Sequence, residues 1–346
     1  MIITIISFVL VLGLCVLVHE WGHFIAARKS GVKVIAFSIG MGKEVYGWTD
    51  KLGTRWRIGI LPVGGYLQIL SEEGSEKLSK KEKSQTVESK PVWKKMWIAG
   101  NGIIMNFILA FALIFSVFAF KGIPQTPPII DSVMADSPAE IAGIKKGDEI
   151  VEIAGQKILS FQEIRTALMS AKKSEIPVLI DRNDKKIKLI ITPKNVEGVP
   201  TLGVQAHANL NKAKKVGVGT AFVKTFTEMH VSVATMFQGL GQIVSGKRSS
   251  KELGGMISIA QMSGRAFNTG FFSFLFFIAF ISINLGVINL FPIPGLDGGH
   301  LVFYLYEMIA RRPAPKIAQI VLTYAGFGFL IFLMIFSTYN DIIRMF

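Results

Sequence analysis

Half of the 346 residues are hydrophobic and the mean hydropathy is +0.46, which excludes an ordinary water-soluble domain. The formal net charge is +14. Because much of this charge flanks long apolar segments and the remaining lysines are not interleaved with aromatic residues, we expect a lipid bilayer with anionic headgroups as the partner and no nucleic acid. The single cysteine, Cys15, excludes a disulfide within the chain.

Four segments are apolar over about the twenty residues that a helix needs to cross a bilayer. They cover Ile2 to Ala27, Trp97 to Phe120, Phe271 to Phe291, after which the chain continues beyond a break, and Ile317 to Phe336. The first segment does not resemble a cleaved signal peptide, because it lacks a basic start and a small-residue cleavage site. Lysines and arginines gather in the loop between the first and second spans and in the loop between the third and fourth. This bias predicts that both loops face the cytoplasm and that both termini face outward.

Residues His19 to His23 read HEWGH and lie near the end of the first apolar segment. An ionisable residue within a membrane span is costly and is by default a candidate functional residue. His19 and His23 are four residues apart on a helix, the spacing at which two imidazoles bind one zinc ion while Glu20 acts as the general base. The alternative is a polar cluster that neighbouring helices satisfy. Cys15 shares the helical face of His19, but a cysteine among apolar side chains usually packs.

The segment from Val34 to Leu70 alternates polar and apolar residues and is rich in aromatic and β-branched side chains, which predicts short strands. Glycines at positions 40, 42, 64 and 65 predict turns or bends. Such a sheet can enter the bilayer only where protein or a water-filled cavity satisfies its backbone. An exposed edge would then offer hydrogen bonds to an extended peptide, and we expect backbone donors between Ile58 and Ile60 to take part. Ser71 to Lys90 reads as a surface loop that leads into a helix start at Ser89 to Trp93.

Residues 127 to 193 read as a compact soluble module. The sequence predicts strands around a short helix, a strand from Glu149 to Ile153, a helix within FQEIRTALM, and a hairpin that turns at Arg182 to Asp184. The motifs Ser137-Pro138-Ala139 and Gly143 to Asp148 closely resemble those of a PDZ domain, a fold that accepts peptide strands along a sheet edge. Lys212 to Ser245 is weakly amphipathic and could form a helix on the membrane surface.

The third apolar segment carries a second polar cluster, with Asn284, Asn289 and then PIPGLDGGH up to His300. Prolines and glycines break the helix near its cytosolic end and present Asp297, whose carboxylate could complete a metal site. Spans one and three have the same direction, so Asp297 and HEWGH lie near the same leaflet. The alternative is that Asp297 only caps a helix that begins at Gly298. His300 is interpreted as a neighbour of the site and not as a ligand.

Together these motifs resemble the site-2 protease family of intramembrane zinc metalloproteases, more narrowly its bacterial RseP type. The matching stretches are HEWGHFIAARKSGV (His19 to Val32), FSIGMGK (Phe37 to Lys43), ESKPVWKK (Glu88 to Lys95), the PDZ-like module, GGMISIA (Gly254 to Ala260) and NLGVINLFPIPGLDGGH (Asn284 to His300). They cover most of the chain in the expected order. Where the family usually has Gly-Pro this chain has Gly102-Ile103, and where the family has GFG it has Met41 between Gly40 and Gly42. Better-known relatives also carry two PDZ modules, and only one is found here.

The resemblance implies one zinc ion per chain, bound by His19, His23 and Asp297, with Glu20 as the catalytic acid and base. It also implies substrate contacts from the polar residues of span three and from a strand edge, namely Asn284, Asn289, Gly40, Gly42, Gly64, Gly65 and Tyr66. The implied activity is regulated intramembrane proteolysis, in which a peptide bond within the membrane span of a single-span protein is hydrolysed. Anti-sigma factors and signal-peptide remnants are the implied substrates.

The implied fold is an α-helical polytopic membrane protein of about four transmembrane helices, with a membrane re-entrant β-sheet and one inserted extracytoplasmic PDZ domain of α+β class. We expect the boundaries 1–120 for the first two helices and the sheet, 121–200 for the PDZ domain, 201–265 for a membrane-surface segment and 266–346 for the last two helices. The location is the bacterial cytoplasmic, or inner, membrane, with the site near the cytoplasmic leaflet. Two alternatives stay open: a catalytically inactive PDZ scaffold, against which Glu20 argues, and a cation transporter, for which polar residues in several spans and repeated halves are lacking.

Overall fold

The computed structural model describes residues 2–72, 78–124, 127–171, 175–196, 199–206, 213–246, 249 and 254–344. The chain divides into two compact units, one made of Met1–Val117 with Phe222–Phe346 and the other of Phe118–Ala221. Part of the expected loop from Ser71 to Lys90 and the start of the expected helix at Lys212 lie outside the described residues. Each unit is described by itself below.

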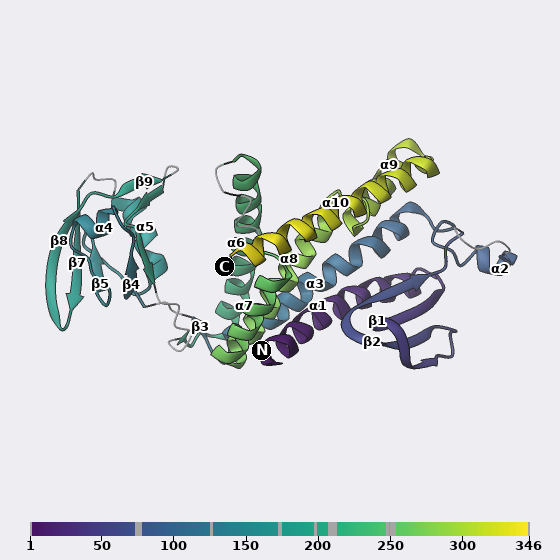
Figure 1. The fold of residues 1–346 in the computed structure, drawn as a ribbon, viewed down its shortest axis with the longest axis horizontal. Coiled ribbons are helices and arrows are strands. Elements are labelled where there is room, and N and C mark those ends of the chain that lie inside the picture. The colour runs from purple at the N-terminus through teal and green to yellow at the C-terminus, as the bar shows by residue number, and fades with distance from the viewer. Residues whose placement is uncertain are drawn as a thin grey trace. The chain divides into compact units, whose positions relative to one another are not determined.

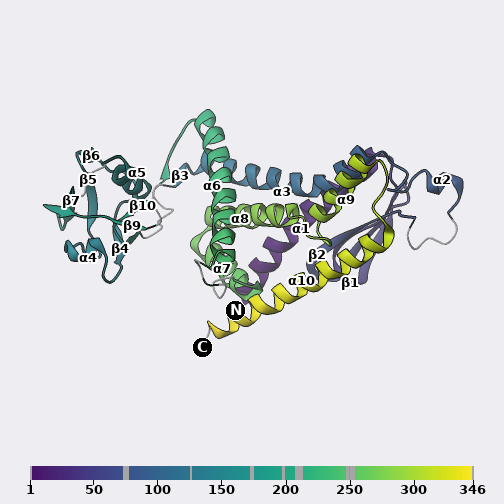
Figure 2. The same cartoon turned by 90° about the horizontal axis from the view of Figure 1, so that it is seen from above.

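The first unit is built on long apolar helices. Among the described residues, four helices are long and apolar enough to cross a membrane: α1 (Ile2–Lys29), α3 (Val92–Phe120), α8 (Phe271–Leu290) and α10 (Lys316–Ile343). Figures 1 and 2 show α1, α3 and α8 alongside one another. The four predicted spans are therefore confirmed as helices, and α3 begins where Pro91 predicts a helix start.

Shorter helices complete this unit. The chain leaves α8 through a loop and re-enters a helix as α9 (Asp297–Ala310), which is the predicted break after the third span. Helix α7 (Met256–Thr269) packs on α1, where the hydroxyl oxygens of Ser7 and Ser263 are 3.1 Å apart. Helix α2 (Lys80–Lys83) is a single turn within the expected surface loop.

Helix α6 (Val218–Val244) is the predicted amphipathic helix, and most of it belongs to the first unit. Its aromatic side chains contact two other helices: Phe226 lies 4.9 Å from Phe111 of α3 and Phe237 lies 5.7 Å from Phe291 after α8, measured between ring centroids. Figure 1 shows α6 crossing the direction of α3 and α8. Its position on a membrane surface stays a prediction.

A curved sheet packs against α1 and is formed by only two strands, β1 (Val34–Thr49) and β2 (Arg55–Ile69). Each strand bends and pairs twice, so that the sheet has four antiparallel segments in the order 46–49, 55–58, 36–39 and 65–68. Gly40, Gly42 and Gly64 have φ angles of +82°, +87° and +78°, which ordinary residues rarely adopt, so the bends predicted from these glycines are confirmed. A Cβ at Gly40 would lie 2.5 Å from the Leu61 carbonyl oxygen, so the two bends also pack closely.

The four-segment order corrects one expectation. Ile58 pairs with Ile39 on one side and with Tyr46 on the other, so it is interior and cannot offer an edge to a peptide. Within the described part of the chain, the outer side of residues 65–69 pairs with no further strand. The sequence pattern shows that a strand is present but does not show that it folds back on its partner.

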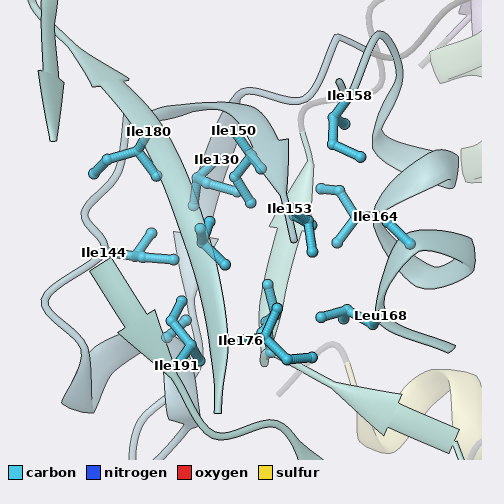
Figure 3. Packing of buried hydrophobic residues seen from close by; sticks show 14 residues of the cluster. Ile130, Ile144, Ile150, Ile153, Ile158, Ile164, Leu168, Ile176, Ile180 and Ile191 are labelled. Carbon is cyan, nitrogen blue, oxygen red and sulfur yellow. The ribbon is translucent and has the colours of Figure 1, made fainter. Parts of the chain in front are cut away.

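The second unit surrounds a core of isoleucines (Figure 3). Its main sheet has the order β6-β5-β7-β8, with β5 (Glu149–Ile153), β6 (Gln156–Lys157), β7 (Ile176–Arg182) and β8 (Lys185–Ile191). Helices α4 (Pro138–Ile141) and α5 (Phe161–Ala171) and the pair β4 (Ile130–Val133) with β11 (Val204–Ala206) complete the core. Two smaller pairs are β3 (Ile123–Pro124) with β12 (Ala213–Lys214), and β9 (Lys194–Val196) with β10 (Val199–Thr201).

The predicted β5 strand, α5 helix and hairpin turn are all present in this unit, and the turn residues Asn183 and Asp184 have positive φ angles. Strand β11 lies beyond Pro193, where the module was expected to end, and Leu202 beside it is buried in the core. The domain boundaries given above stay predictions.

Candidate metal centre and catalytic cavity

Helix α1 places His19 and His23 on one face, and the first turn of α9 brings Asp297 against them. The Nε2 atoms of the two histidines are 3.2 Å apart, and Asp297 Oδ2 is 3.0 Å from His19 Nε2 and 3.3 Å from His23 Nε2. The side chains of His19, His23 and Asp297 are 9%, 12% and 18% exposed. Three potential ligand atoms from two distant parts of the chain therefore converge in a nearly buried space.

The tautomer of His23 indicates what this space can hold. Its Nδ1 lies 2.7 Å from the carbonyl oxygen of Ile98, which can only accept, so Nδ1 carries the proton. Nε2 then has a free lone pair directed at His19 Nε2 and at the Asp297 carboxylate. Asp297 Oδ2 is buried without a hydrogen-bond donor among the described residues. Lone pairs and a carboxylate that face one another repel unless a cation lies between them, so the donor set fits a zinc ion.

Helix α3 supplies the surroundings of the two histidines. Asn106 is fully buried, and its side-chain amide lies 3.2 Å from His19 Nδ1. The amide nitrogen is placed nearest the ring, and the amide oxygen is buried without a partner among the described residues. Exchanging the two amide atoms, which have nearly the same shape, lets Oδ1 accept from Nδ1–H and leaves Nε2 free for a metal, the orientation that metal-bound histidines require. Asn101 Nδ2 donates to the Gly22 carbonyl oxygen at 2.6 Å and fixes α3 on α1.

Gly102 of α3 lies directly against both histidine rings. A Cβ at this position would lie 2.7 Å from His23 Cε1 and 2.8 Å from His19 Cε1. Asn106 and the steric role of Gly102 were missed in the sequence analysis. The signal available for Asn106 is a polar amide within an otherwise apolar span, which is costly unless it has a partner.

A cavity of about 450 Å³ opens beside the three candidate ligands. Its lining residues in the described chain come from α1, β2, α3, α8, α9 and the loops before α3 and α9. They are Val16, His19, Glu20, His23, Leu67, Ile69, Val87, Lys95, Ile98, Ala99, Leu285, Asn289, Gly295, Leu296, Asp297, His300 and Tyr304. Glu20 thus shares the cavity with the three candidate ligands and lies beside the backbone N–H of Leu67 in β2. The cavity therefore brings together a candidate metal site, a carboxylate and one segment of the sheet.

The structure brings only some of the expected substrate residues to this cavity. Asn289 lines it, whereas Asn284 donates to the Phe280 carbonyl oxygen of its own helix at 2.7 Å and is not among the lining residues. The five expected sheet residues, Gly40, Gly42, Gly64, Gly65 and Tyr66, are not among them either, although their neighbours Leu67 and Ile69 are. Tyr66 instead accepts a hydrogen bond from Arg57. Substrate contact by these residues stays a prediction.

The alternatives at Asp297, Cys15 and His300 can now be compared with the geometry. Helix α9 begins at Asp297 itself, its N-cap is Leu296, and no side-chain cap bond is formed, so capping does not explain the carboxylate. Cys15 packs among Val11, Phe277 and other apolar residues. Its sulfur lies 3.7 Å from a backbone carbonyl oxygen, and it is not part of the ligand cluster. His300 lines the cavity and stacks beside Tyr304 at a centroid distance of 6.4 Å.

Comparison with known proteins identifies the family. Residues 7–333 match the model of peptidase family M50. Proteins named "Putative zinc metalloprotease" from Campylobacter jejuni and Rhizobium meliloti are 38% and 34% identical to this chain. The matches cover 97% and 98% of this chain and 92% and 96% of those relatives. The crystal structure of the PDZ domain of an SdrC-like protein from Listeria innocua is 30% identical over 24% of this chain and 96% of that chain, with a TM-score of 0.22.

The chain therefore belongs to peptidase family M50, and the predicted membership of the site-2 protease family is confirmed. It is a membrane metallopeptidase with several apolar helices that can span a bilayer. The identities of the metal ligands, the catalytic residue and the substrates are proposals and follow below.

Proposed function

We propose that this protein hydrolyses a peptide bond within the membrane span of single-span membrane proteins, such as anti-sigma factors or signal-peptide remnants, with one zinc ion per chain. The observation that carries the proposal is the convergence of His19 Nε2, His23 Nε2 and Asp297 Oδ2 within about 3 Å of one another, beside Glu20 in one cavity. When bound, zinc supplies the Lewis acidity that activates a water molecule and a peptide carbonyl.

Glu20 is the proposed acid and base. Its carboxylate faces the cavity, where it accepts the proton of the attacking water and later delivers that proton to the amine nitrogen of the leaving peptide. Of the two alternatives, an inactive scaffold has no use for Glu20 beside a metal site. A cation transporter requires a path for the ion, and the nearly buried ligands of this site argue for a resident metal.

The sheet is the proposed partner of the unwound substrate. A peptide bond inside a membrane helix is protected by helical hydrogen bonds, and an edge that replaces these bonds lowers the cost of unwinding. Leu70 N–H donates inward to the Lys33 carbonyl oxygen, whereas Leu67 N–H is directed outward to Glu20, so odd positions from Gly65 to Ile69 present their backbone groups outward. We therefore assign the substrate edge to this segment, and Asn289 is the proposed polar contact on the opposite wall.

The second unit is proposed to be an extracytoplasmic PDZ domain that acts as a filter against substrates whose bulky outer domain is still attached. The site then lies near the cytoplasmic leaflet of the inner membrane. A filter is favoured over a recruiter because enzyme and substrate already meet by lateral diffusion in the bilayer. Deletion of residues 127–193 distinguishes the two: a filter predicts cleavage of substrates with intact outer domains, and a recruiter predicts slower cleavage of all substrates.

The experiment that tests the activity is the Glu20→Gln variant with a model single-span substrate. The amide keeps the size and polarity of the side chain but cannot accept the proton, so zinc content measured by metal analysis stays at one per chain while cleavage falls to background. Glu82→Gln, in the exposed helix α2, is the matched control and keeps full activity. Substantial cleavage by the purified Glu20→Gln protein would assign the proton transfer to another residue.

A further inference from the structure

Helix α9 carries Asp297 at its first residue, yet little of the helix is held by packing. Within the described chain, only Gly298 and Gly299 of α9 are buried. Both pack on the preceding loop region, since a Cβ at Gly298 would lie 2.5 Å from the Leu290 carbonyl oxygen and one at Gly299 would lie 2.5 Å from that of Ile293. These local contacts fix the first turn relative to its own loop. They do not fix the direction of the helix relative to α1 and α3, which hold the remaining site.

A buried ion pair supplies the missing connection. Lys95 Nζ in α3 lies 2.8 Å and 3.1 Å from the two carboxylate oxygens of Glu307 in α9. The Lys95 side chain is 8% exposed. The basic side chains in six other ion pairs are at least 26% exposed, namely those of Arg28, Lys33, Arg55, Arg57, Lys146 and Arg182. Each charge in a pair this far removed from water depends on the other, because removing one side chain would leave the other charge buried and unpaired.

The pair lies at the end of two residue stripes that face each other across the cavity. On α3 the spacing of Lys95, Ile98, Gly102 and Asn106 places them on one face, and the last three contact the histidines. On α9 the positions 297, 300, 304 and 307 share a face in the same way, and the first three line the cavity. The metal ligand and the ion pair are therefore the two ends of one helix face.

We propose that Lys95 and Glu307 form a positioning pair that sets the direction of α9 and thereby holds Asp297 in register with His19 and His23. This inference rests on the proposed zinc site. Asp297 and Glu307 are ten residues apart, which is about 15 Å along a helix. A tilt of about 2° about the ion pair displaces the Asp297 end by about 0.5 Å, the limit within which a metal constellation must be held. A purely structural pair would change the stability of the protein without changing its affinity for zinc.

The test is a competition titration of zinc against a chromogenic chelator with the full-length protein in detergent. Glu307→Gln and Lys95→Met are each expected to weaken zinc binding about ten- to a hundredfold, the range found when a group that orients a metal ligand is lost. The charge-exchanged double variant Lys95→Glu, Glu307→Lys keeps the pair and is expected to recover to within about threefold of the wild type. Lys94→Met is the matched control, because Lys94 reaches the Ser30 carbonyl oxygen and the Trp93 ring and not the site.

Glu307→Gln with zinc affinity within about threefold of the wild type overturns the inference, whatever its thermal stability. A charge-exchanged protein as weak as the single variants also overturns it. If Lys95→Met cannot be recovered folded, Glu307→Gln decides alone, since it removes one charge at the more exposed end of the pair. Asp297→Asn separates this inference from the proposed function: zinc retention by that variant would refute the ligand set itself, independently of the ion pair.

Discussion

A single methyl group at Gly102 is expected to distort the proposed metal centre and weaken its binding of zinc. The Cβ of Gly102→Ala would lie 2.7 Å from His23 Cε1 and 2.8 Å from His19 Cε1, with α3 fixed on α1 by Asn101. Favourable contacts between carbon atoms begin near about 3.5 Å, so the His19 ring would have to retreat by roughly 0.7 Å. The His23 ring would have to move further, because its Nε2 lies nearest to the added methyl group. The added methyl group would contact both imidazole rings, so moving one ring alone would not relieve the overlap.

The size of the effect follows from that displacement. Ligands must be held within about 0.5 Å of the productive geometry, and a misplacement of about 1 Å costs on the order of a hundredfold in rate. Zinc affinity is therefore expected to fall about a hundredfold, which is about 2.7 kcal/mol of binding free energy. The catalytic efficiency of the variant should fall by at least as much.

Gly100→Ala is the matched control on the same helix, because a Cβ at Gly100 meets nothing within 4 Å. The same substitution there is expected to leave zinc binding and cleavage unchanged and to stabilise the helix by up to about 1 kcal/mol. Zinc content, the midpoint of thermal unfolding and cleavage of a single-span substrate are measured for both variants. A Gly102→Ala protein that binds one zinc ion and cleaves at the wild-type rate would refute the docking of α3 against the histidines.

Three further predictions follow from other parts of the structure. Asn106→Leu removes the partner of His19 Nδ1 and is expected to lower zinc affinity about ten- to a hundredfold in a chelator competition, whereas an unchanged affinity would contradict the orienting role. Ile69→Pro removes an outward backbone donor and is expected to abolish cleavage while zinc content is kept, whereas Ile69→Ala stays active; equal activities would refute the substrate edge. In the second unit, burial alone would raise the pKa of Asp148, but the Arg182 guanidinium and the Lys145 N–H outweigh it and lower that pKa. The resulting stability is present above the unfolded-state pKa of about 3.9 and is lost as the pH falls through the lower folded value. Hydrogen exchange of β5 and β7 should therefore accelerate below about pH 4. The Asp148→Asn variant should be less stable at neutral pH, and its hydrogen exchange should lose this dependence on pH.

That the two histidines lie together could be predicted from the sequence because their geometry is local. A spacing of four residues on one helix brings His19 and His23 together whatever the rest of the chain does. Asp297 lies far away in the sequence, and it was found only because a carboxylate after a broken span is unusual and the orientation of the spans places it at the same leaflet. The distances of 3.0 Å and 3.3 Å to the histidines require the packing of α9 and could not be derived from spacing.

The residues that were missed depend on how two helices dock. Gly102 and Asn106 are four residues apart on α3, and nothing in that spacing shows that they face His19 and His23 rather than lipid. The sheet illustrates the same limit. Alternation predicts β1 and β2, but the double pairing of Ile58 depends on bends in both strands. Ile58 is therefore interior, and the segment that ends at Ile69 has an unpaired outer side among the described residues.

The departures of this chain from its family's pattern can be interpreted in the same physical terms. The family has Gly-Pro where this chain has Gly102-Ile103, and the steric requirement lies on the glycine, since it alone faces the imidazole rings. Ile103 is 5% exposed and lies within a continuous α3, so it fills buried space and keeps a backbone donor that proline lacks. In Gly40-Met41-Gly42 both glycines have positive φ angles, whereas the Met41 side chain between them is half exposed. The bend therefore requires glycine at its first and third positions and places no such requirement on the middle residue.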